Sequence, residues 1–140
     1  MKNEVYIDNE QKTICCTLEG ELDIEKSIIL SKDLRKKSSE LGFNVFYDAR
    51  KLYVTDNVLP ADFTTKLSTL LEKLSTLLEI SSHRIVRVAI LYELGEYDEY
   101  WKFYEDVAVN RGLSVKIFTK KEEAMKWLRI APSFLVAPEL

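Results

Sequence analysis

The chain has 140 residues, of which 46% are hydrophobic and 31% charged, and this composition is typical of one soluble globular domain with its own core. Its 20 Lys and Arg against 23 Asp and Glu give a net charge of −3, so the basic surplus of a nucleic-acid-binding protein is missing. One histidine and two adjacent cysteines, Cys15 and Cys16, exclude a disulfide framework, a cysteine-based zinc site and any site that needs two histidines.

Two alternating segments open the chain. Residues 4–8 alternate, residues 9–11 are typical of a turn, and residues 12–19 alternate again. One face of the second segment collects its apolar side chains, Ile14, Cys16 and Leu18. The pattern predicts an antiparallel hairpin in which Cys16 is buried and Cys15 projects to the opposite face of the sheet.

A helix and a short strand follow the hairpin. Apolar positions recur at helical spacing between Asp23 and Leu41, and Gly42 stands where a glycine commonly ends a helix. Residues 43–48 are typical of a short apolar strand. We expect a loop over residues 49–60, before the next helix.

A seven-residue unit, Lys66 to Glu72, is repeated without change as Lys73 to Glu79. Its leucines follow the i, i+3, i+4, i+7 spacing of an amphipathic helix over residues 63–80. The leucine face would pack on the core of the domain or form a helix–helix contact between two copies. Two heptads are too short for a sustained coiled coil, and both alternatives stay open.

The second half of the chain alternates strands with helices. We expect strands over residues 84–92 and 113–117, because the first is apolar throughout and the second alternates. Helices are predicted over residues 96–111 and after the capping box Thr119 to Glu122. Pro132 should end the last helix, and residues 130–140 form an apolar, Pro-broken tail.

These elements predict the order ββαβαβαβα and an α/β fold. The single domain would hold a mixed, mostly parallel sheet that opens with an antiparallel hairpin, together with about four helices. Its predicted bounds are residues 1–129, and residues 130–140 form the C-terminal tail.

Three segments share a pattern with one known family. They are the helix approach Leu18 to Leu22, the strand end Phe46-Tyr-Asp-Ala-Arg50, and the closing strand and helix from Val115 to Leu128. Over residues 4–129 the chain resembles the SpoIIAA-like branch of the STAS superfamily, whose fold is similar to the CRAL-TRIO lipid-carrier domain. The resemblance implies a regulatory or protein–protein interaction module rather than an enzyme.

The resemblance also implies an interaction loop. Anti-sigma antagonists of the STAS superfamily carry an Asp and, eight residues later, a second Asp that is followed by a Ser and then by a phosphorylatable Ser or Thr. Placing Asp48 on the first position puts Asp56 on the second, and Asn57 falls where a hydroxyl residue belongs. Thr55 is nearby but does not match the phosphorylated position. We therefore expect an interaction loop with these four residues that lacks the phosphorylation switch.

Aromatic side chains gather on and before the predicted helix at 96–111. The set comprises Tyr92, Tyr97, Tyr100, Trp101 and Tyr104. At about 100° per residue the helical four share one face. This face either packs on the sheet or lines a partly open pocket, since buried tyrosine hydroxyls need partners. By resemblance to lipid carriers the region would line an apolar cavity, so we predict that these five residues bind an apolar small molecule or lipid.

No catalytic residue and no metal ligand is predicted. Ser82 and His83 are neighbours on an extended segment and point apart, so they form no dyad. Asp48 and Asp56 flank a loop at the expected carboxyl end of a parallel strand, where α/β sheets bind ligands, so chemistry on this pair is a weaker alternative. Cys15 has no cation beside it in the sequence that would favour a thiolate.

Function and location follow as expectations. The glycines stand apart from one another and form no phosphate-binding loop, so no cofactor is predicted. The sequence shows no apolar leader and no apolar run of about 18 residues, which favours a cytoplasmic protein without an integral membrane segment. We expect a non-enzymatic module whose partner is a protein or a second copy of the chain, as in a homodimer. The alternative is a carrier or sensor of an apolar small molecule.

Overall fold

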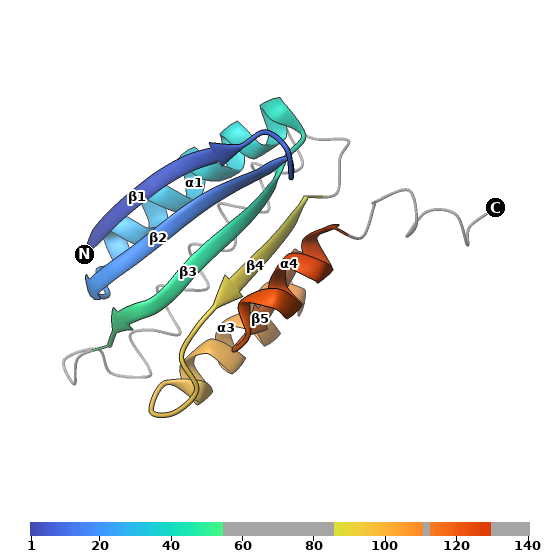
Figure 1. The fold of residues 1–140 in the computed structure, drawn as a ribbon. Coiled ribbons are helices and arrows are strands. Elements are labelled where there is room, and N and C mark those ends of the chain that lie inside the picture. The colour runs from blue at the N-terminus through green and yellow to red at the C-terminus, as the bar shows by residue number, and fades with distance from the viewer. Residues whose placement is uncertain (55–85, 111–112, 130–140) are drawn as a thin grey trace.

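The computed structural model describes residues 1–54, 86–110 and 113–129. The predicted leucine helix at 63–80, His83 and the tail at 130–140 lie outside these residues. The described strands form one sheet in the spatial order β1 (Lys2–Asp8), β2 (Thr13–Glu21), β3 (Asn44–Tyr53), β4 (Arg87–Leu91) and β5 (Ser114–Phe118). Only β1 is antiparallel to its neighbour (Figure 1), which confirms a mixed, mostly parallel sheet.

Three helices in the described part of the chain cover the sheet. They are α1 (Ile24–Leu41), α3 (Asp98–Asn110) and α4 (Lys121–Arg129). α1 and α3 lie on one face, and α4 lies on the other (Figure 1). The described order is thus ββαβ and then βαβα, and the fourth predicted helix falls outside the described residues. None of the described helices is long and apolar enough to span a membrane.

The opening hairpin forms as predicted. β1 and β2 pair from Lys2 and Glu19 to Asp8 and Thr13, around a turn at residues 9–12. An Asp8 carboxylate oxygen accepts two backbone N–H bonds of 3.1 Å within that turn, which satisfies donors that no strand reaches. Cys16 is buried as expected.

The predicted first helix is also confirmed, with both of its ends capped. At the N-terminus the Asp23 carboxylate accepts the backbone N–H of Lys26 at 3.1 Å. At the C-terminus Gly42 has a φ of 72° and donates its N–H to the carbonyl of Ser38. Between these caps Leu34 is buried, whereas Leu41, which continues the helical spacing, is exposed.

The expected loop over residues 49–60 is wrong at its beginning, because β3 continues to Tyr53. A bulge between Thr17 and Glu19 shifts the register of β2, and pairing with β3 then resumes from Glu19 opposite Lys51. Ala49 and Leu52 are buried within this extension. Asp48 therefore lies inside a strand and not at its carboxyl end.

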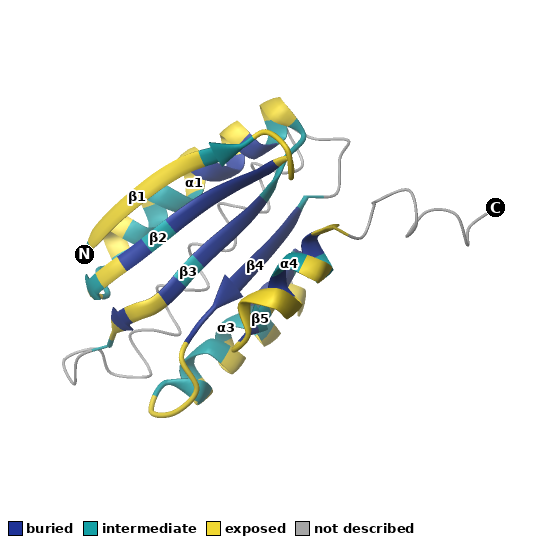
Figure 2. Ribbon diagram, in the orientation of Figure 1, coloured by how far each residue is buried: buried dark blue, intermediate teal, exposed yellow. Residues whose placement is uncertain are grey.

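Two apolar cores lie on the two faces of the sheet. The larger one packs the sheet against α1 and α3, and the smaller one packs it against α4. All five residues of β4 are buried, as predicted for a strand covered on both faces, while β1 forms an exposed edge (Figure 2). The larger core contains the cavity that forms the candidate site.

Candidate functional site

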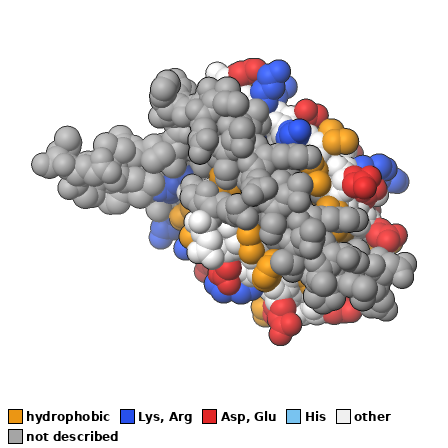
Figure 3. All heavy atoms as spheres, turned by 180° about the vertical axis from the view of Figure 1, so that it is seen from behind, with side chains coloured by type: hydrophobic (Ala, Val, Ile, Leu, Met, Phe, Trp, Pro, Cys, Tyr) orange, Lys and Arg blue, Asp and Glu red, His pale blue; other side chains and the backbone are white. Residues whose placement is uncertain are grey.

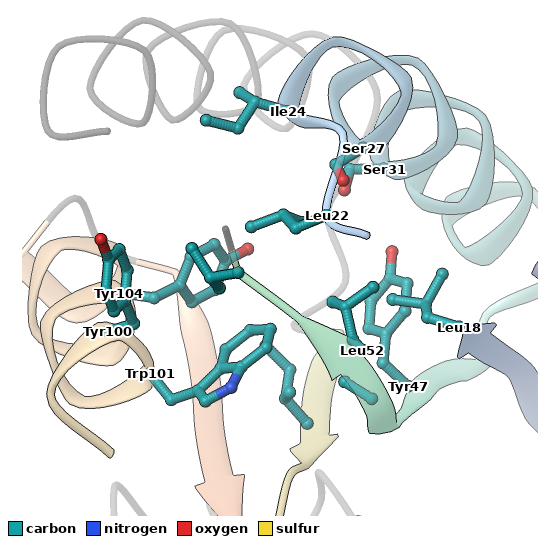
Figure 4. A pocket seen from close by; sticks show the side chains of 13 residues that line it. Leu18, Leu22, Ile24, Ser27, Ser31, Tyr47, Leu52, Tyr100, Trp101 and Tyr104 are labelled. Atoms are coloured by element: carbon teal, nitrogen blue, oxygen red, sulfur yellow. The ribbon is translucent and has the colours of Figure 1, made fainter. Parts of the chain in front are cut away.

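A cavity with a volume of about 80 Å³ lies between α1, α3 and the sheet (Figure 4). A cavity needs about 10–15 Å³ of this volume to hold one water, so this cavity has room for roughly five to eight waters. Aliphatic and aromatic side chains form most of its wall: Leu18, Leu22, Ile24, Tyr47, Ala49, Leu52, Val54, Ile90, Tyr100, Trp101 and Tyr104. Ser27 and Ser31 of α1 add two hydroxyl groups. This space suits a small molecule with an apolar body.

Strand alternation and helix periodicity build this wall. Side chains of one parity on β2 and β3 face α1 and α3, so Leu18, Tyr47 and Ala49 reach the cavity. The i, i+1, i+4 positions of α3 bring Tyr100, Trp101 and Tyr104 to the same space. Seen from behind, the molecule shows hydrophobic side chains as well as charged groups of both signs on the surface that the described residues form (Figure 3).

The five predicted aromatic residues take three different places. Tyr100, Trp101 and Tyr104 line the cavity, as the pocket hypothesis requires. Tyr92 is buried behind the wall, and its ring centroid lies 6.3 Å from that of Trp101. The rings of Trp101 and Tyr104 meet edge to face at 6.2 Å, so aromatic contacts hold Trp101 from both sides. Tyr97 lines a second, adjoining cavity instead.

Polar groups are concentrated around two tyrosines of the wall. Tyr47 shares a hydrogen bond with Ser31, and its hydroxyl points toward α1 (Figure 4). Burial raises the pKa of Tyr47 and that of Tyr104, so both phenols stay neutral at physiological pH. The positive charge of Arg35 on α1 opposes part of both pKa shifts.

A second cavity of about 360 Å³ adjoins the first one at the carboxyl ends of β3 and β4. Ala49, Leu52 and Trp101 line both cavities. The wall of the second cavity also carries charges of both signs, from Arg50, Lys51, Glu93 and Glu96. Crevices at this edge of a parallel sheet are where α/β proteins commonly bind ligands. A molecule in the apolar cavity would therefore have a polar neighbour on this side.

Of the four residues of the predicted interaction loop, the structure describes only Asp48. Thr55, Asp56 and Asn57 lie outside the described residues. Asp48 pairs across the sheet with Leu91, a residue of the core under α4, and thus faces away from the cavity. Its carboxylate forms an ion pair of 2.7 Å with Arg50, which holds the pKa of Asp48 below its ordinary value. The interaction that the structure shows for Asp48 is thus its ion pair with Arg50.

The two cysteines lie on opposite faces, as predicted, and both are buried. Burial raises the pKa of Cys15 and raises that of Cys16 to about 11. The expectation that Cys15 lacks a neighbouring cation is wrong, because Lys121 at the start of α4 lies near enough to oppose this shift. Burial still has the larger effect, so neither thiol is activated.

The sequence alone did not predict the parts of the cavity wall that α1, β2 and β3 supply. Strand alternation signals Tyr47 and Ala49, because they share parity with the apolar face of β3. Ser27, Ser31 and Arg35 follow at four-residue spacing on α1, which signals a polar stripe on an otherwise apolar helix face. Neither pattern shows by itself that the stripe faces the aromatic residues of α3.

Within the described ranges, no group of three or more His, Cys, Asp or Glu side chains gathers as metal ligands do. The cavity is instead a chamber of aliphatic, aromatic and hydroxyl groups. No protein-family model matches the chain, and a comparison with curated proteins finds no similar sequence.

Proposed function

We propose that this protein binds a small apolar molecule in the cavity between α1, α3 and the sheet, and serves as its carrier or sensor. The single observation behind this proposal is the cavity wall, where aliphatic and aromatic side chains outnumber a few hydroxyl groups. Small-molecule sites in proteins commonly have this construction, in which apolar residues hold the ligand and a few polar groups orient it.

A small side chain on the cavity wall supports the proposal. A larger side chain at Ala49, which is 2% exposed on the cavity wall, would fill part of this space. A bound molecule explains why small side chains remain there.

The regulatory, non-enzymatic module that the STAS resemblance implies remains a second proposal. Its interaction loop was expected at Asp48, Thr55, Asp56 and Asn57, and the last three lie outside the described residues. Asp48 faces α4 and is engaged with Arg50. The cavity therefore offers the stronger basis for a function.

Binding can be tested with 1-hexanol and 2-phenylethanol, which match the size of the cavity. Burying a six-carbon chain at about 0.8 kcal/mol per CH₂ gives about 5 kcal/mol, or a Kd of roughly 0.3 mM. The fluorescence of Trp101, measured in a Trp127→Phe background, would report occupancy because Trp101 lines the cavity. We expect saturable changes with both alcohols.

Ala49→Leu provides the decisive variant, because its longer side chain occupies the cavity. It should bind at least tenfold more weakly while its thermal unfolding stays cooperative. Lys36→Leu places the same side chain at an exposed position of α1 and should bind like the native protein. Absence of saturable binding to the native protein, or equal binding by folded Ala49→Leu, would contradict the proposal.

A further inference from the structure

The first strand, β1, presents an exposed edge of the sheet. It pairs with β2 on one side and is the outermost of the described strands in the spatial order. Its residues from Lys2 to Tyr6 are all exposed (Figure 2). Two of them are large apolar side chains, since Val5 is 41% and Tyr6 is 57% exposed. An exposed edge strand of this kind is a template for pairing with another chain.

The outermost described strand at the other end of the sheet, β5, carries a device against such pairing. The Phe118 carbonyl accepts the N–H of Tyr92 on the side of β4. Because backbone groups alternate in direction along a strand, the N–H of Ile117 points away from β4. The Glu105 carboxylate on α3 accepts this N–H at 2.7 Å. A charged side chain thus occupies a donor that a further strand would need, which favours β1 as the edge for association.

The sequence of β1 is complementary to itself. If two copies of the strand run antiparallel with Val5 opposite Val5, Lys2 lies opposite Asp8 and Glu4 lies opposite Tyr6. Residues directly opposite each other share a face of the sheet, and pairs of opposite charge stabilise it. A twofold axis repeats every pair, so this contact would contain two Lys2–Asp8 ion pairs.

Charge also disfavours the neighbouring registers. The smallest shift that keeps every side chain on its own face of the sheet is two residues. One direction of the shift places Glu4 opposite the Glu4 of the second copy, and the other direction places Glu4 opposite Asp8. Like charges directly opposite each other destabilise a sheet. The charges of β1 therefore favour the antiparallel register that is centred on Val5.

We propose that β1 is a self-association surface, to which a second copy of this chain adds its own β1 in the antiparallel register centred on Val5. The sheet would then continue across both copies, with backbone hydrogen bonds supplying affinity and the Lys2–Asp8 pairs supplying specificity. None of the described residues that line the apolar cavity belongs to β1. This inference therefore goes beyond the proposed function and does not depend on ligand binding.

Sedimentation velocity over a range of protein concentrations tests the association. We expect native protein to show a reversible equilibrium between monomer and dimer in the micromolar range, because one pair of strands forms a small interface. High salt should weaken the dimer, since ion pairs at exposed positions are screened. A native protein that remains monomeric at about 0.1 mM would overturn the proposal.

Charge reversal tests the register. Lys2→Glu places a negative charge opposite Asp8, and Asp8→Lys places a positive charge opposite Lys2, so each variant should dimerise at least tenfold more weakly. An equimolar mixture of the two variants should associate again as a heterodimer, because both opposite pairs are then complementary. Lys116→Glu makes the same change on β5 and should dimerise like the native protein.

Asp8 also accepts two N–H bonds in the turn after β1, so circular dichroism must show that Asp8→Lys is folded. Independently of that variant, Val5→Cys should be joined to a second copy by a short bis-maleimide. Val109→Cys, at an exposed position of α3, is the matched control and should stay unlinked. A dimer that Lys2→Glu leaves unchanged, two folded variants that do not associate in the mixture, or an unlinked Val5→Cys protein would overturn the proposal.

Discussion

The guanidinium carbon of Arg87 lies 5.0 Å from the ring centroid of Trp127, and one of its Nη atoms donates a 2.6 Å hydrogen bond to the Trp127 carbonyl. Trp127 is in the last turn of α4, where helix carbonyls lack intrahelical partners and a positive charge is favourable. One side chain at the start of β4 thus attaches the end of α4 to the sheet.

Arg87→Met should therefore destabilise the protein. It leaves the Trp127 carbonyl without its donor and removes the contact with the ring, and we expect the free energy of unfolding to fall by about 1–3 kcal/mol in urea denaturation. Trp127→Phe, which retains the carbonyl and a smaller ring, should cost less than Trp127→Ala. An Arg87→Met protein as stable as the native one would show that the attachment contributes nothing.

Asn44 forms a second attachment at the same end of the sheet. Its Nδ2 donates to the Leu128 carbonyl and its Oδ1 accepts the Arg87 backbone N–H, both at 2.9 Å. Asn44→Ala leaves both backbone groups unpaired, and we expect a loss of about 2–4 kcal/mol in urea denaturation. Asn3→Ala on the exposed strand β1 should change stability by less than about 0.5 kcal/mol. Equal effects of the two variants would contradict this account.

Alkaline pH should destabilise the native protein through Tyr47. Burial raises its pKa above the value of about 10 for an unfolded phenol, so this contribution is present below pH 10 and is lost as pH rises further. The urea midpoint should therefore fall between about pH 9 and 11, and it should fall less in Tyr47→Phe. Tyr53→Phe, at an exposed position, is the control and should follow the native protein. The same decline in Tyr47→Phe would exclude Tyr47 as its cause.

Both cysteines should resist modification in the folded protein. Burial covers the thiols of Cys15 and Cys16 and raises both pKa values, so few thiolates form at about pH 8. A chromogenic disulfide reagent should react with both thiols slowly in buffer and at once in denaturant. The single variants Cys15→Ser and Cys16→Ser show which thiol is responsible for the slow reaction of the folded protein. A fast reaction of folded protein would contradict the buried positions.

Local patterns determine several elements of this fold. The alternation over residues 4–19 specifies the hairpin, because one face of the second strand is consistently apolar. Asp23 and Gly42 delimit α1, since one supplies an N-cap oxygen and the other adopts a left-handed conformation. The apolar run ending at Leu91 likewise predicts a strand buried on both faces.

Other features depend on partners far along the chain. β3 extends to Tyr53 because β2 resumes pairing with it after a bulge, and no property of residues 49–53 alone predicts that pairing. This extension also places Asp48 within a strand and not at its carboxyl end. The prediction of a loop from residue 49 was wrong, because the length of β3 depends on its pairing with β2.

The candidate site shows the same division. Helical periodicity by itself determined that Tyr100, Trp101 and Tyr104 share one face of α3, and the low counts of histidine and cysteine made metal and disulfide chemistry poor candidates. Only the tertiary structure decided that this face meets Tyr47 of β3 and the hydroxyls of Ser27 and Ser31 on α1. A sequence pattern gives the direction of a side chain relative to its own element, whereas a cavity arises from how separate elements pack together.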